Sequence, residues 1–225
     1  TPTKALAPWN TAGQYADARL RALSYALLAP NPHNRQPWEA ELIGDDEVVI
    51  WRDEKRDLPV TDPFARQLTI GMGCFLELMK MAAAEEGYGV ETALFPRGED
   101  GTVAQCRFVP DTAKADPLFA FVMERRSFKE AFDGRPVRGQ AIETLSQWGA
   151  IYASGPELEA LQSISAEAWM VEMLTEDAYM ESIDLMRIGK RQINANPDGI
   201  DVGGPTLEAL LAVGLFNHET AADMT

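Results

Sequence analysis

The sequence predicts an α+β fold, with antiparallel strands in its first half and helices in its second half. Three observations lead to this prediction. Segments of alternating hydrophobicity occur in pairs around short polar turns before residue 110. Longer segments with apolar residues at helical spacing lie beside them. No strand pattern is found after residue 155, so the rest of the chain is expected to be helical.

Two helices and four strands are expected in the first part of the chain. Apolar residues recur at helical spacing over 17–28, and two prolines then end that helix. The longest helical pattern covers 64–86, with Gly87 as its C-cap. Two strands form a hairpin around a Gly-Asp-Asp turn, and two more are joined by a polar turn at 97–101. The predicted strands cover residues 38–43, 48–51, 90–95 and 103–109.

Composition divides the chain into two expected units. Residues 111–117 are small, polar and flanked by prolines, which is typical of a linker. Residues 1–110 form the first expected unit and residues 118–225 the second. Helical patterns in the second unit cover residues 118–126, 139–148, 155–174, 177–193 and 206–215.

Composition and charge exclude several classes of partner. The chain has 225 residues, 46% of them hydrophobic, and a formal net charge of −15. Such a chain repels nucleic acids and anionic membranes, and no apolar run reaches the roughly 18 residues of a membrane span. Cys74 and Cys106 match no metal or disulfide spacing, and only two histidines accompany them. We therefore predict no nucleic-acid partner, no membrane insertion and no metal.

The first segment that points to function is a polar loop rich in proline. Its prolines fix φ and restrict the preceding residues, so its amide groups are presented with little entropy to lose. Such a loop can face a planar heterocycle. Alternatively, it is a helix-to-strand connector whose asparagines satisfy local backbone groups. The segment reads Pro30-Asn31-Pro32-His33-Asn34-Arg35-Gln36-Pro37-Trp38.

The second segment carries three cations and a hydroxyl within five residues. Arg125, Arg126 and Lys129 can bind a phosphate, and Ser127 can add a hydrogen bond. The alternative is a solvated helix end whose cations face the C-terminal dipole. An anionic cofactor would need such a local basic site within this acidic chain.

Together the two segments resemble the FMN-dependent nitroreductase family. The second is similar to that family's Arg-(His/Arg)-Ser-x-(Lys/Arg)-x-Phe motif, and the first to its Ser-Pro-Ser-Ser-x-Asn-x-Gln-Pro-Trp loop. The resemblance implies that one side of FMN is held by Arg125, Arg126, Ser127 and Lys129. It implies that the other side is lined by Pro30, Asn31, Pro32 and Asn34, with Trp38 in the core.

The order of the two segments resembles a fused branch of the family. There two degenerate halves of one chain form a pseudo-dimer, as in Acg-type flavin-binding proteins and exported nitroreductase-like proteins with a twin-arginine (Tat) signal. Asn31 and Pro32 stand where the family has serines, so hydroxyl contacts are lost. The family's second half would continue beyond Thr225, so the second unit is expected to be incomplete. The start at Thr1 and the resemblance leave the periplasm and the cytoplasm both open.

Three weaker signals lead to no site. Residues 71–76 lack the third glycine of a dinucleotide fingerprint. Residues 194–199 resemble the start of a calcium loop, but Pro205 stands where an acid is needed, so a turn is expected. His33 could donate a proton near a flavin or simply hydrogen-bond within its loop.

The resulting hypothesis is a flavin oxidoreductase. By resemblance, hydride passes from NAD(P)H through FMN to a nitro, quinone or similar small acceptor, and homo-oligomers are possible. Because the flavin carries the chemistry, no catalytic side chain is assigned. The alternative is a flavin-sequestering protein with little turnover, in which helices from 177 to 215 form a lid. A third possibility is a degenerate member of the family that no longer binds FMN and in which the two segments are only structural.

Overall fold

The chain forms two compact units in the computed structural model, which describes residues 3–98 and 101–223. The first unit joins the N-terminal residues up to Arg125 with the C-terminal residues from Met180 onward, and the second comprises Arg126–Tyr179. These units reflect packing and differ from the expected boundaries at 110 and 118. That residues 118–225 correspond to a degenerate second half remains a prediction.

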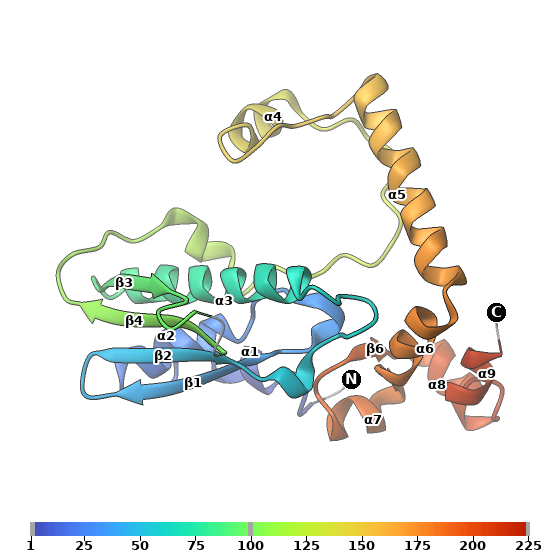
Figure 1. Cartoon of the computed structure of the whole chain (residues 1–225), viewed down its shortest axis with the longest axis horizontal. Coiled ribbons are helices and arrows are strands. Elements are labelled where there is room, and N and C mark those ends of the chain that lie inside the picture. The colour runs from blue at the N-terminus through green and yellow to red at the C-terminus, as the bar shows by residue number, and fades with distance from the viewer. Residues whose placement is uncertain (1–2, 99–100, 224–225) are drawn as a thin grey trace. The chain divides into compact units, whose positions relative to one another are not determined.

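The first unit is built on a four-stranded antiparallel sheet with the strand order β1-β2-β4-β3 (Figure 1). The β1–β2 hairpin turns at Gly44, which has a φ of +52°. The predicted turn at 97–101 joins β3 to β4 but includes residues 99 and 100, which lie outside the described residues. All four predicted strands are confirmed to within a residue or so, as β1 (Trp38–Ile43), β2 (Glu47–Arg52), β3 (Gly89–Leu94) and β4 (Thr102–Val109).

Helices α2 (Ala18–Ala26) and α3 (Arg66–Ala84) cover one face of this sheet and form the core with it. Alternate residues of β2 and β4 point into this core, as expected for strands buried on one face. Phe75 of α3 is buried and stacks on Trp38, with ring centroids 4.8 Å apart. Trp38 therefore packs against the core, as the sequence predicts.

Helix α3 begins where a buried carboxylate caps it. Both Asp62 oxygens accept backbone N–H groups at 2.9 Å, one from Arg66 and one from Leu68. Asp62 is 6% exposed, and such a cap satisfies amide donors that the first helical turn leaves unpaired. This cap fixes the position of α3 relative to the preceding loop.

The C-terminal part of the first unit contains two strands that the sequence did not predict. β5 (Met186–Ile188) and β6 (Ile200–Val202) pair in parallel on either side of α7 (Gly189–Ala195). The expectation of no strand after residue 155 is therefore wrong. The predicted helix over 177–193 is likewise broken, because β5 separates α6 (Glu176–Asp184) from α7.

Other elements are shorter than predicted. The helix expected over 118–126 is a 3₁₀ helix, η3 (Pro117–Phe121), which starts at a proline and does not continue as an α-helix. The remaining elements of the first unit are α1 (Ala7–Thr11), η1 (Pro32–Asn34), η2 (Glu54–Arg56), α8 (Pro205–Ala212) and α9 (His218–Ala222).

The second unit is helical and almost entirely exposed. It contains α4 (Gly139–Leu145), α5 (Pro156–Leu174) and the first residues of α6. Neither α4 nor α5 buries a residue. The predicted α+β class is confirmed by the whole set of elements. Within residues 3–98 and 101–223, no helix combines the length and hydrophobicity that crossing a membrane requires.

Candidate functional site

The proline-rich loop, residues 30–37, follows α2 and leads into β1. Its backbone is unusual because His33, Asn34 and Gln36 all adopt left-handed conformations, with φ of +48°, +52° and +50°. Few residues other than glycine adopt this conformation, and asparagine is among them. Asn31 closes the loop, since its Oδ1 accepts the Gln36 N–H at 2.7 Å and its Nδ2 donates to the Ala29 carbonyl at 3.1 Å. The Asn31 side chain therefore serves the shape of the loop.

A glycine on α3 lets this loop lie directly against the helix. A Cβ added at Gly71 would be 3.0 Å from Asn31 Cβ and 3.3 Å from Asn31 Cα. Gly71 is buried, so this close approach is part of the packed interior. The loop is thus packed against α3, and it leads directly into β1.

Arg125 brings the start of the second predicted segment to this loop. Its Nη2 donates a hydrogen bond of 2.6 Å to the carbonyl of Leu28, just after α2 ends. A cation at this position also complements the helix dipole. Arg126, Ser127 and Lys129 belong to the second compact unit, so their meeting with the loop stays a prediction.

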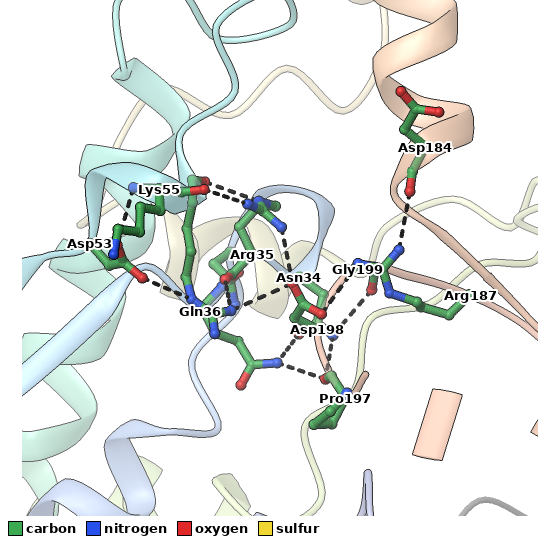
Figure 2. A network of polar contacts seen from close by, with 12 residues as sticks. Asn34, Arg35, Gln36, Asp53, Lys55, Asp184, Arg187, Pro197, Asp198 and Gly199 are labelled. Carbon is green, nitrogen blue, oxygen red and sulfur yellow. Dashed lines mark hydrogen bonds and ion pairs between the residues drawn. The ribbon is translucent and has the colours of Figure 1, made fainter. Parts of the chain in front are cut away.

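Residues 196–199, between α7 and β6, dock on the proline-rich loop (Figure 2). We call them the 196–199 loop. The Asn34 amide donates to the carbonyls of Pro197 and Gly199, at 3.3 and 3.2 Å. The Gln36 amide donates to the Pro197 carbonyl at 2.8 Å, and the Gly199 N–H donates to the Asn34 carbonyl at 3.1 Å. The predicted cofactor residue Asn34 therefore binds another part of the chain.

A carboxylate surrounded by arginines lies at the centre of this contact. Asp198 pairs with Arg35 at 2.9 Å, Arg187 at 3.3 Å and Arg56 at 3.5 Å. Burial lowers the pKa of the Arg35 guanidinium, and the carboxylate of Asp198 opposes that shift. Arg35 also donates to the carbonyls of Arg56 and Lys55, at 3.0 and 3.2 Å. The cluster joins the proline-rich loop, η2 and β5.

A second carboxylate, Glu181 of α6, fastens the same C-terminal part to the loop before α3. Its oxygens accept the N–H groups of Val60 and Thr61, at 3.1 and 2.8 Å, and the Thr61 hydroxyl at 2.6 Å. Burial raises the pKa of Glu181, but these hydrogen bonds and the nearby charge of His33 lower it overall. Glu181 is therefore held in its ionised form.

These hydrogen bonds of Glu181 predict that the stability of the fold depends on pH. Because the folded-state pKa of Glu181 lies below its ordinary value of 4.5, its stabilisation is complete above that value and is lost as the pH falls further. Glu181→Gln should lower the free energy of unfolding by about 1 kcal/mol at pH 7, after discounting for partial exposure.

Urea unfolding at pH 7 and at a pH below the lowered pKa measures this difference. The gap between variant and wild type should close in acid. Glu77→Gln, at an exposed position on α3, is the matched control and should change little at either pH. A pH-independent gap for Glu181→Gln would contradict the assignment.

The first unit also carries a cavity of about 800 Å³. Its walls come from the end of β2, the loop before α3, the first turns of α3 and the ends of β3 and β4. Arg52 and Asp57 form an ion pair of 3.4 Å in its wall. Its size suits a small molecule. Among the described residues that line it, none belongs to the two predicted segments.

Several residues of this site escaped the sequence analysis. Arg35 lies inside the first segment but carried no predicted role, and Asp198 lies in a stretch interpreted only as a turn. Arg56, Arg187 and Glu181 look like ordinary surface charges in a chain in which 24% of residues are charged. The contact between Arg35 and Asp198 spans 163 residues, and no local pattern signals it.

Comparisons with known proteins agree with the resemblance. A protein of Mycobacterium tuberculosis strain H37Rv named "Putative NAD(P)H nitroreductase" is 26% identical over 190 residues, which cover 81% of this chain and 54% of the relative. Another from that strain, "Putative NAD(P)H nitroreductase acg", is 29% identical over 133 residues, which cover 56% of this chain and 40% of the relative. No family model matches the chain.

The chain spans about half the length of these relatives. Their sequence similarity extends over most of this chain and so includes far more than the two short segments. The chain is a distant relative of proteins named as NAD(P)H nitroreductases, which supports the nitroreductase resemblance.

Proposed function

We propose that this chain forms part of an FMN site in an NAD(P)H-dependent oxidoreductase of the nitroreductase type. The electron acceptor is a nitro compound, a quinone or a similar small molecule. The site lies at the junction of two degenerate halves of a pseudo-dimer, between the proline-rich loop and the segment that begins at Arg125. The relatives' names and the position of Arg125 beside the loop support this proposal.

The observation that carries the cofactor assignment is the direction of two side-chain amides. Asn34 and Gln36 both donate hydrogen bonds to carbonyl oxygens, those of Pro197 and Gly199. The pyrimidine edge of a flavin also presents carbonyl oxygens, so these donors would fit it chemically in place of the 196–199 loop. Pro30 and Pro32 stiffen the loop, and Gly71 allows it to rest on α3.

In this proposal the chain's own residues bind FMN and orient it. When bound, FMN would accept hydride from the nicotinamide and deliver it to the acceptor. Arg125 and Arg126 balance the phosphate charge, while Ser127 and Lys129 add hydrogen bonds at the same side. On the other side, Asn34 orients the ring edge, and Asn31 holds the loop in shape.

The test is the anaerobic visible absorption spectrum of the purified protein after incubation with FMN, before and after NADPH or NADH is added. We expect a bound flavin band that bleaches with one of the two nucleotides. No bound flavin after incubation would contradict the proposal.

A second candidate function is flavin sequestration with little turnover. The docking of the 196–199 loop on the proline-rich loop favours it, because the carbonyls of Pro197 and Gly199 already accept hydrogen bonds from the side-chain amides of that loop. A flavin band that persists with both nucleotides, but bleaches with dithionite, is the result expected for sequestration.

The cationic segment gives a further prediction about cofactor affinity. Arg125→Ala combined with Ser127→Ala should weaken FMN binding by about tenfold or more, because a charge-assisted contact and a hydroxyl donor are lost. Fluorescence titration of FMN measures the change, and circular dichroism checks that the variant is folded. Arg138→Ala, at an exposed position of the second unit, is the control. Unchanged affinity in the double variant would refute the site assignment.

A further inference from the structure

The arginine cluster around Asp198 carries an excess of positive charge. Three guanidiniums, those of Arg35, Arg56 and Arg187, face the carboxylates of Asp198 and Asp53, the latter 3.3 Å from Arg56. Three cations against two anions leave a local charge of +1 in a chain whose net charge is −15. A positive site within such a negative chain is suited to binding an anion.

The carboxylate of Asp198 is shared among three guanidiniums. Asp198 makes a single contact with each arginine, and the two contacts with Arg187 and Arg56 are long, at 3.3 and 3.5 Å. No pair is bidentate, although a guanidinium fork favours that geometry. The Nε atom of Arg187 is buried without a hydrogen-bond partner among the described residues. Other N–H groups of Arg35 and Arg187 donate to backbone carbonyls, so a larger anion would gain here by forming the bidentate contacts that Asp198 lacks.

The cluster is enclosed enough to strengthen such an interaction. The side chains of Arg35 and Arg187 are only 11% and 16% exposed, while that of Arg56 is 37% exposed and leaves a way in from solvent. Ion pairs of partly buried groups are screened less by salt than pairs on the surface. Phosphate has the bidentate geometry and the charge that a group of arginines recognises.

The carboxylate that fills the cluster lies on the short loop between α7 and β6. The 196–199 loop belongs to no helix or strand and contacts the proline-rich loop through the amides of Asn34 and Gln36 (Figure 2). A ligand that replaces Asp198 at the arginines would also weaken those contacts. Residues 196–199 therefore link the anion site to the proline-rich loop.

We propose that Arg35, Arg56 and Arg187 form an anion site that Asp198 fills from within the chain, and that a phosphate group takes its place. The ligand is inorganic phosphate, at a site separate from the flavin phosphate that the proposed function places at Arg125 and Arg126. This inference does not rest on the proposed function. When phosphate displaces Asp198, the side-chain amides of Asn34 and Gln36 become free to bind a ligand.

The test uses Asp198→Asn in the full chain, titrated with inorganic phosphate at constant ionic strength by calorimetry. We expect phosphate to bind the variant about tenfold or more tightly than the wild type, because the competing carboxylate is gone. Adding Arg56→Gln to the variant should abolish the gain. An unchanged affinity in folded Asp198→Asn would overturn the proposal.

Asp57→Asn is the matched control, because it also removes a carboxylate from an Arg–Asp pair of the first unit. It should show no gain, and an equal gain would overturn the proposal by showing a general charge effect. Should Asp198→Asn fail to fold, hydrogen exchange of the wild type decides. Phosphate, but not chloride at equal ionic strength, should speed exchange of the Gly199 N–H, which donates to Asn34. An unaltered rate would overturn the proposal.

Comparison of FMN with riboflavin, which lacks the phosphate, tests whether the anion site is separate from the flavin site. If FMN binds Asp198→Asn more tightly than the wild type while riboflavin does not, the cluster binds the flavin's phosphate, and the separate anion site and the placement of that phosphate at Arg125 and Arg126 both fail. If neither flavin binds but phosphate does, the anion site stands and the proposed FMN function fails. If FMN binds both proteins equally and phosphate shows no gain, the function stands and this inference fails.

Discussion

Replacing Gly199 with alanine is expected to detach the 196–199 loop from the proline-rich loop. Gly199 has a φ of +83°, which costs a residue with a Cβ about 1–2 kcal/mol. A Cβ there would also overlap the Leu185 carbonyl oxygen and lie 2.9 Å from Arg187 Cζ. That carbonyl accepts the N–H of Ile200 at 2.9 Å, so the backbone between β5 and β6 must shift. We expect a local loss of about 2 kcal/mol or more.

Hydrogen exchange of the amides at residues 199 and 200 measures this loss, and 2 kcal/mol corresponds to exchange about thirtyfold faster. Gly214→Ala is the control, because Gly214 has a φ of +73° and no described atom within 4 Å of an added Cβ. The Gly214→Ala variant therefore has the energetic cost of the left-handed backbone, but its added Cβ overlaps no described atom. Equal effects in the two variants would show that close packing at Gly199 does not hold the loop.

Phe75→Ala is expected to destabilise the first unit by about 3–5 kcal/mol. Phe75 is 1% exposed, lies in the core between α2, α3 and the sheet, and stacks on Trp38. The substitution leaves a cavity and removes this aromatic contact. Because Trp38 directly follows the proline-rich loop, the candidate site should loosen as well.

Urea unfolding followed by circular dichroism gives the free-energy change. Phe64→Ala is the control, since Phe64 is 86% exposed and its removal should cost less than about 0.5 kcal/mol. A loss below about 1 kcal/mol for Phe75→Ala would mean that the core described here does not support the fold.

The sequence predicts the sheet of the first unit well because its strands are long enough to show a pattern. β4 alternates buried and exposed residues over much of its length, and the β1–β2 hairpin turns at a glycine. β5 and β6 have three residues each, too few for alternation to be visible. They are strands because they pair with each other across α7, and that pairing depends on tertiary structure rather than on local sequence.

The candidate site could be predicted only in part for the same reason. Prolines and asparagines identify a stiff loop, and the sequence correctly places Trp38 against the core. It does not reveal that Asn34 binds Pro197 and Gly199, since those residues lie more than 160 positions away. Asp198 and Arg35 are informative only once the fold brings them together.

The attachment of the C-terminal part also has a consequence for folding kinetics. The contacts that fasten it join residues 120 to 190 positions apart, from Thr61 with Glu181 to Lys4 with Asn194. The β1–β2 hairpin, in contrast, joins residues that lie close together in the sequence. Contacts that close long loops require more chain entropy before they yield stabilisation, so they form late. We therefore expect the sheet with α2 and α3 to form first and the arginine cluster around Asp198 to be completed last, which rapid-mixing hydrogen exchange would test.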